Sequence, residues 1–107
     1  MPFINSKISI PVTGSQEIEL KTRLGKAIEL IPGKSESWLM VGFEPEYRLY
    51  FRGSNAEPVA MVDVSVFGSE NPDAFSKLTG EICNIFKDVL GIAPDHVYVK
   101  YQPVSNW

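Results

Sequence analysis

The chain has 107 residues, 44% of them hydrophobic and 21% charged, which is the size and composition of one globular domain. Ten Lys and Arg against 13 Asp and Glu give a formal net charge of −3, so the sequence lacks the basic surface that nucleic-acid binding requires. No stretch approaches the roughly 20 apolar residues of a membrane span, and no basic and apolar leader precedes the first predicted strand. We therefore expect a cytoplasmic protein, unless an unconventional route exports it, with no nucleic-acid and no membrane partner.

The chain contains one cysteine, Cys83, and one histidine, His96. A single thiol excludes an internal disulfide, and one Cys with one His is too little for a protein-bound zinc ion. Cys83 lies near the apolar stripe of a predicted helix, so we interpret it as a small core residue and not as a reactive thiol. We expect His96 to be exposed at the start of a strand, without a catalytic role. The sequence predicts no metal and no cofactor.

The first half of the chain predicts a strand, a helix and a strand. Residues 2–10 mix β-branched with polar residues, a pattern typical of a half-buried strand. A helix follows, with Ser15 as its expected N-cap and Pro32-Gly33 at its end. Its apolar residues recur at helical spacing: Leu20, Leu24, Ala27, Ile28 and Ile31. Residues 38–43 are almost continuously apolar, which indicates a strand covered on both faces.

The second half predicts the same order of elements after a connecting segment. Residues 47–51 are a short strand candidate, and residues 58–66 predict a longer, largely apolar strand. Asn71-Pro72 is a typical helix start, with the asparagine as N-cap and the proline at the first helical position. The apolar stripe of this helix contains Phe75, Leu78, Ile82, Ile85, Phe86 and Val89. Gly91 ends it, and residues 96–101 predict the last strand.

The two halves also match each other in sequence. Residues 2–10 align with residues 58–66 at an offset of 56, where Pro2 matches Pro58 and Ile-Ser-Ile matches Val-Ser-Val. Taken with the order of elements, this match predicts a duplicated βαβ unit.

The duplication defines the expected architecture. We interpret residues 1–107 as one domain built from two βαβ units, at about residues 2–43 and 58–101. Right-handed βαβ units can join into one four-stranded mixed sheet with both helices on one face. The other face would be bare, and its strands are too apolar to face water, which predicts a symmetric homo-oligomer.

The chain begins Met1-Pro2, and removal of Met1 would give Pro2 a free secondary amine. An internal proline has no N–H and no basic lone pair, whereas an N-terminal one can exchange protons. An ordinary α-amino group titrates at about 7.7–8.0, so modest desolvation or a nearby cation would leave the amine neutral at pH 7. Many chains begin Met-Pro without a chemical reason, so this pair alone does not establish a catalytic base.

Short motifs along nearly the whole chain make it similar to a known family. They are Met1-Pro2-Phe3-Ile4, Pro32-Gly33-Lys34, Gly53-Ser54, Glu57-Pro58, Ser65-Val66-Phe67-Gly68 and Pro94-Asp95-His96-Val97-Tyr98. In this order and spacing they resemble the macrophage migration inhibitory factor and D-dopachrome tautomerase family, within the tautomerase superfamily. The resemblance implies an α/β (α+β) subunit of duplicated βαβ units, a homotrimer, and an active site at each subunit interface.

The resemblance also implies roles for particular residues. Pro2 matches the N-terminal proline that acts as general base and acid, and Lys34 matches the lysine that binds the substrate carboxylate. Phe67 stands where the family uses a main-chain N–H, and Trp38 where it has an aromatic residue at the pocket rim. Tyr98 matches the tyrosine contributed by a neighbouring subunit. Without the resemblance, Lys34 is a solvated residue after a helix and Tyr98 a strand-packing residue.

The implied reaction is the keto–enol tautomerisation of a small aromatic α-keto acid such as phenylpyruvate, without a cofactor. A cation such as Lys34 would attract the carboxylate and lower the pKa of the Pro2 amine. The alternative is a cytokine-like binding or signalling protein with vestigial catalysis. Under this alternative the partner would be a host receptor, although nothing in the sequence indicates one. Dehalogenation or decarboxylation would need further charged residues near the proline, for which Arg48 and Arg52 are the candidates.

Three features depart from the best-known members of the family. Lys100 stands where the vertebrate cytokine has an asparagine, and it is either a second cation of the pocket that favours anionic substrates or a solvated edge lysine. Residues 59–62 replace a Cys-x-x-Cys motif, so a thiol–disulfide activity has no chemical basis here. The sequence stops at Trp107, before the aromatic tail of relatives, which predicts either a more open pocket or a continuation beyond it.

Overall fold

The computed structural model describes residues 1–107 and contains one four-stranded sheet. The elements are β1 (Pro2–Ile8), α1 (Gly14–Ala27), η1 (Ile28–Leu30), η2 (Glu36–Trp38), β2 (Met40–Glu44), β3 (Ala60–Phe67), α2 (Pro72–Leu90), η3 (Pro94–His96) and β4 (Val97–Val104), where η marks a 3₁₀ turn. The strand order is β2-β1-β3-β4. The pairs β1–β2 and β3–β4 are parallel and β1–β3 is antiparallel, so the predicted mixed sheet is confirmed.

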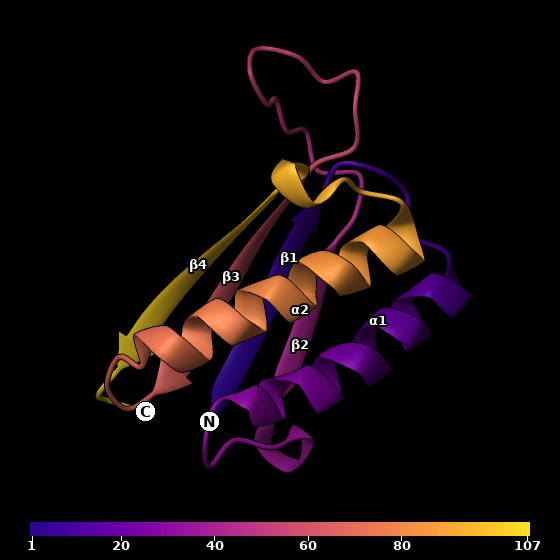
Figure 1. Cartoon of the computed structure of the whole chain (residues 1–107). Helices are drawn as coiled ribbons and strands as arrows, with labels where there is room; N and C mark the ends of the chain where they lie inside the picture. The colour runs from indigo at the N-terminus through magenta and orange to yellow at the C-terminus, as the bar shows by residue number, and fades with distance from the viewer.

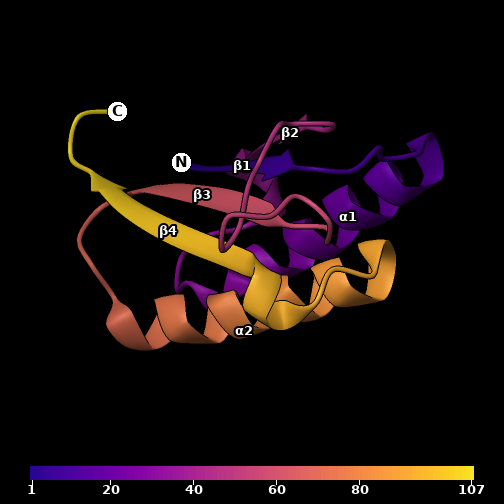
Figure 2. The same ribbon diagram turned by 90° about the horizontal axis from the view of Figure 1, so that it is seen from above.

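Both helices cover the same face of the sheet (Figure 1, Figure 2), as predicted. Alternate residues of β1 and β3 point toward the helices and are buried, among them Ile4, Ile8, Val62, Val64 and Val66. They pack against the apolar stripes of α1 and α2 in one core of 19 buried residues. No helix has the length and apolar character that a membrane crossing requires.

The helix ends confirm one predicted cap and correct another. Asn71 caps α2 by accepting the N–H of Ala74 at 3.2 Å, and Gly91 ends the helix with φ at 69°. The N-cap of α1 is Thr13 and not Ser15. Thr13 Oγ1 accepts the N–H of Gln16 at 3.2 Å, and the Gln16 side chain accepts the Thr13 N–H at 2.9 Å. This reciprocal capping box needs Glu or Gln three residues after the cap, and Ser15 has Ile18 there.

One strand prediction in the middle of the chain is wrong, and another is confirmed as β2 but with a later start and without cover on both faces. Residues 47–51 form no strand but belong to a loop that extends beyond the end of the sheet (Figure 1), with one isolated bridge between Phe51 and Ser54. Trp38 belongs to η2, and β2 is an edge strand that pairs only with β1. Met40 is 69% exposed, so β2 is not covered on both faces. A continuous apolar run cannot distinguish a buried central strand from an edge strand that lacks a neighbour in its own chain.

The two βαβ units are related by 58 residues and not by 56. β1 and β3 begin at Pro2 and Ala60, and α1 and α2 begin at Gly14 and Pro72, each pair 58 residues apart. Pro58 therefore precedes β3 and is not the counterpart of Pro2. A shift of two residues keeps every side chain of a strand on the same face of the sheet. The apolar residues of the two repeats therefore align at an offset of 56 as well as at one of 58.

The sheet face opposite the helices is mixed in polarity and not the apolar surface that the sequence predicted. One row of paired residues crosses all four strands in the middle of this face: Gly42, Asn5, Asp63 and Lys100. Lys7 forms an ion pair with Asp63 at 3.5 Å, and Lys100 forms one at 2.9 Å. The Lys100 contact does not have the geometry of a hydrogen bond. Asn5 donates to Glu44 at 2.8 Å. The strands are apolar on average because their apolar residues gather on the helix side, so this face alone does not demand a partner.

Candidate active site

The amino end of β1 lies beside the carboxyl end of β3 (Figure 1). Pro2 pairs with Val66 in the antiparallel ladder, and its side chain is buried on the helix side of the sheet. One residue further out, the N–H of Phe67 donates to the carbonyl oxygen of Met1 at 3.2 Å. The ladder therefore holds the nitrogen of Pro2 next to the main chain of Phe67.

Lys34 reaches the same place from the turn after η1. Gly33 takes a φ of 82°, which favours glycine, and the Lys34 N–H donates to the Ile31 carbonyl oxygen at 3.1 Å. The Lys34 ammonium donates to the carbonyl oxygen of Phe67 at 2.8 Å and lies 5.9 Å from the centre of the Phe67 ring. Desolvation, and then the charge of Lys34, lower the pKa of the Met1 amine. A cation and a main-chain N–H thus converge on the amino end of the chain.

Trp38 lies at this end of the sheet as well. In the parallel pair, Met40 of β2 stands opposite Phe3, and Trp38 ends η2 two residues before Met40. The Trp38 side chain is 71% exposed and that of Phe67 46% exposed. Two exposed aromatic side chains therefore flank the amino end of β1, where they could contact an apolar ligand.

Tyr98 and Lys100 lie away from this group within one chain. Tyr98 pairs with Met61, five residues along β3 from Val66, which is about 17 Å at roughly 3.3 Å per residue. In Figure 1, β4 begins at the end of the sheet opposite the N-terminus. Tyr98 is 60% exposed, and Lys100 is paired with Asp63 on the polar sheet face. A site that combines Tyr98 or Lys100 with Pro2 needs a second copy of the chain.

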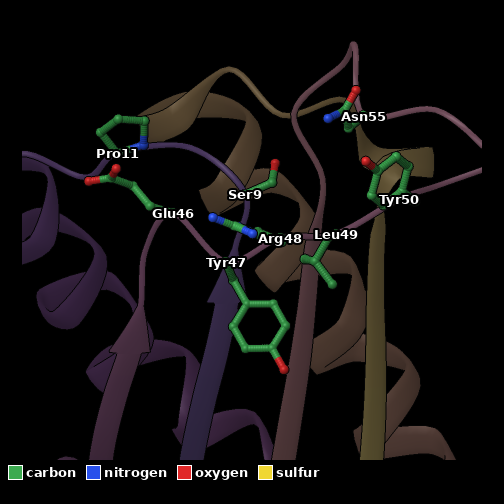
Figure 3. A pocket seen from close by; sticks show the side chains of 8 residues that line it. All are labelled: Ser9, Pro11, Glu46, Tyr47, Arg48, Leu49, Tyr50 and Asn55. Atoms are coloured by element: carbon green, nitrogen blue, oxygen red, sulfur yellow. The ribbon is translucent and has the colours of Figure 1, made fainter.

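Two cavities of the single chain lie at the opposite end of the sheet from Pro2, and another of about 290 Å³ lies on the polar sheet face, where Phe3 and Lys100 are among its lining residues. One of about 460 Å³, shown in Figure 3, is lined by Ser9, Pro11, Glu46, Tyr47, Arg48, Leu49, Tyr50 and Asn55. A smaller, mostly apolar one of about 170 Å³ includes Met61, His96 and Tyr98. Arg48 lines the first cavity and the Arg52 guanidinium lies 4.8 Å from the Phe51 ring centre, so neither arginine is near Pro2. The groups that converge beside Pro2, and not these cavities, form the candidate site.

Cys83 and His96 are both partly covered. Cys83 packs against the core, and burial raises the pKa of its thiol, which makes the reactive thiolate scarcer. The His96 side chain is only 19% exposed, with Nδ1 2.9 Å from a carboxylate oxygen of Asp95. The predicted exposure of His96 is wrong because Phe51, from the loop, packs against the imidazole with ring centres 5.1 Å apart.

Comparisons with known proteins agree on one family. The family model of macrophage migration inhibitory factor (MIF) matches residues 1–107. The MIF2 structure of Leishmania major has a TM-score of 0.90 and 27% identity, and the match covers 97% of this chain and 89% of that chain. For the MIF homologue of Prochlorococcus marinus the values are 0.85 and 26%, with 96% and 89% covered. A search of curated proteins found no match.

One more distant structure shares the fold alone. The protein Pt0534, crystallised after inactivation by 2-oxo-3-pentynoate, has a TM-score of 0.84 at 14% identity, and the match covers 96% of this chain and 85% of that chain.

Proposed function

Because the chain belongs to the macrophage migration inhibitory factor family, we propose that it is a cofactor-free keto–enol tautomerase of small aromatic α-keto acids such as phenylpyruvate. The family belongs to the tautomerase superfamily, so isomerase chemistry is the class of activity that the fold supports. One observation carries the proposal: the Lys34 ammonium and the Phe67 main chain meet beside Pro2.

The proposed mechanism begins with the removal of Met1, which leaves a secondary amine on Pro2. The Lys34 ammonium binds the carboxylate of the enol through a charge-assisted hydrogen bond. The neutral amine of Pro2 then accepts the proton of the enol hydroxyl, and the resulting ammonium delivers a proton to the neighbouring carbon to give the ketone. Burial and the charge of Lys34 lower the pKa of the Met1 amine, and the same two causes acting on the Pro2 amine would favour its neutral, proton-accepting form.

The remaining groups of the proposed site hold the substrate ring. Trp38 and Phe67, both exposed beside Pro2, supply aromatic walls. Tyr98 and Lys100 join them from a neighbouring copy in a homotrimer, with Lys100 as a second cation for anionic substrates. Their distance from Pro2 in one chain and the exposure of Tyr98 support this arrangement.

An assay of the chain without Met1 tests the proposed function. The protein should convert the enol of phenylpyruvate to the ketone at about 1–10³ turnovers per second, in proportion to its concentration. Enol absorbance measures the reaction, and the intact mass verifies that Met1 is absent. A rate no higher than that of the unfolded chain would reject the proposal. It would favour the alternative, a cytokine-like binding protein with weak or vestigial catalysis.

Mixed oligomers test whether the site is shared. We expect Pro2→Gly and Tyr98→Ala proteins each to be weakly active, because each lacks one part of every site. The two proteins are unfolded and refolded together in equal amounts. About a quarter of the sites should then combine an intact Pro2 from one subunit with an intact Tyr98 from another, and about a quarter of the wild-type activity should return. Mixing Pro2→Gly with Lys34→Ala should restore nothing, because both changes affect the same subunit's half of the site. Equal behaviour of the two mixtures would contradict the shared site.

A further inference from the structure

In the unprocessed chain, Met1 occupies the space beside Pro2, Lys34 and Phe67. The pair Met1–Phe67 continues the ladder one step beyond Pro2–Val66, and the Phe67 N–H donates to the Met1 carbonyl oxygen at 3.2 Å. In an antiparallel sheet, a residue that donates to its partner also turns its own carbonyl toward it, so both main-chain groups of Phe67 face Met1. The Lys34 ammonium binds that Phe67 carbonyl oxygen at 2.8 Å. Met1 therefore lies against the donors of the site.

We propose that Met1 is an intramolecular plug of the binding site. Its carbonyl oxygen accepts the hydrogen bond of the Phe67 N–H, which a substrate oxygen accepts in the processed chain. This inference rests on the proposed function for the kind of ligand. Removal of Met1 then has two consequences, since it frees the nitrogen of Pro2 and vacates the acceptor position on Phe67. The processing step builds the binding site as well as the base.

The chemistry of removal is a simple hydrolysis. A methionine aminopeptidase adds one water across the Met1–Pro2 bond. The Met1 carbonyl leaves as the carboxylate of free methionine, and Pro2 retains its nitrogen with a new N–H bond. The plug is thus lost irreversibly, together with its hydrogen bond from the Phe67 N–H.

A Phe67 N–H without a hydrogen-bond acceptor would bind an anion strongly. Phe67 is 46% exposed at the end of β3, so a ligand can reach its main chain. A main-chain N–H without a partner gains most from an ionised acceptor, and the Lys34 ammonium beside it draws a carboxylate to the same place. Met1 offers that N–H only a neutral carbonyl oxygen, which holds the position in the unprocessed chain but supplies no negative charge for Lys34.

Binding of an inert carboxylate, 3-phenylpropionate, to two forms of the chain tests the proposal. The processed form starts at Pro2. The unprocessed form is released in vitro from an N-terminal carrier by a protease that cleaves directly before Met1, so that no aminopeptidase acts on it. We expect the unprocessed form to bind at least about tenfold more weakly, the effect of one charge-assisted hydrogen bond. The Phe67 amide should exchange with deuterium faster in the processed form and become protected when the probe binds.

A third form separates the Met1 carbonyl from the Met1 side chain. A Met1→Gly chain released in the same way keeps the carbonyl and should bind the probe as weakly as the unprocessed form. Equal affinity of the processed and unprocessed forms, or full binding by the Met1→Gly form, would overturn the proposal. Absence of binding to the processed form would overturn it too. Turnover of phenylpyruvate by that form, measured separately, would then show that the proposed function stands without the plug.

Discussion

Insertion of one alanine before Pro2 is expected to lower kcat/KM for phenylpyruvate by about 10²–10⁴-fold, the contribution of a general acid–base group. The inserted residue converts the Pro2 nitrogen into an amide, which has no basic lone pair and no N–H. The new terminal amine lies one residue further out, about 3.3 Å away along the strand. Kinetics on protein of verified N-terminal mass measure the effect.

Two further proteins make the result specific to Pro2. Pro2→Gly keeps a terminal amine at the same place but loses the ring that makes the amine secondary and fixes its orientation, and we expect it to lose most of the activity. An alanine inserted between Ala56 and Glu57 is the matched control, because it lengthens an exposed loop at the other end of the sheet and leaves the Phe51–Ser54 bridge intact. That insertion should leave kcat/KM unchanged. Full activity of both Pro2 variants would show that another group moves the proton.

The sequence was sufficient for the fold wherever the signal is local. The side chain of Asn71, the fixed φ of Pro72 and the left-handed conformation of Gly91 set the ends of α2 within a few bonds. The apolar and β-branched residues of β1 and β3 predicted both strands, although not which of their residues are buried. The mixed order of strands then followed from two βαβ units and their single handedness.

The errors arose where the pattern of one segment does not show which groups that segment contacts. Residues 47–51 have strand-like composition but no strand beside them in this chain, so they remain a loop. The polarity of the bare sheet face could be predicted only by assigning each residue to a face, which places Asn5, Asp63 and Lys100 in one row. Ser15 and Thr13 are both good caps, and only the side chain of Gln16 decides between them.

For the candidate site, motifs named the residues but not their contacts. Nothing near Lys34 in the sequence indicates that its ammonium binds the carbonyl oxygen of Phe67. The hydrogen bond from the Phe67 N–H to Met1 follows from the strand register that pairs Pro2 with Val66. The sequence offset between the two repeats does not give this register. Tyr98 lies too far from Pro2 in one chain for sequence spacing to decide whether the two ever meet.

Replacement of Lys34 by glutamine is expected to change both the binding of phenylpyruvate and the pH dependence of the reaction. Loss of a charge-assisted hydrogen bond to the carboxylate should raise KM by about 10- to 100-fold. Lys34 also helps to lower the pKa of the Met1 amine, and we expect the same effect on the Pro2 amine of the processed chain, of which only the neutral form accepts a proton. In Lys34→Gln that pKa rises toward the ordinary value of about 8, so the acid limb of kcat/KM moves to higher pH. Desolvation, which is the larger cause of the lowered pKa, remains in Lys34→Gln. The acid limb of kcat/KM should therefore move only part of the way.

The two effects of Lys34 can be measured separately. The methyl ester of phenylpyruvate carries no charge, so Lys34→Gln should hardly change its KM, whereas the acid limb should still move because the amine is the same. Lys34→Arg keeps the positive charge and should leave the limb in place. Lys7→Gln removes a lysine that pairs with Asp63 on the polar sheet face, and it should leave both KM and the limb unchanged. If Lys34→Gln raised KM for the acid but left the limb in place, Lys34 would bind substrate without tuning the base. The neutral amine of Pro2 would then depend on burial alone.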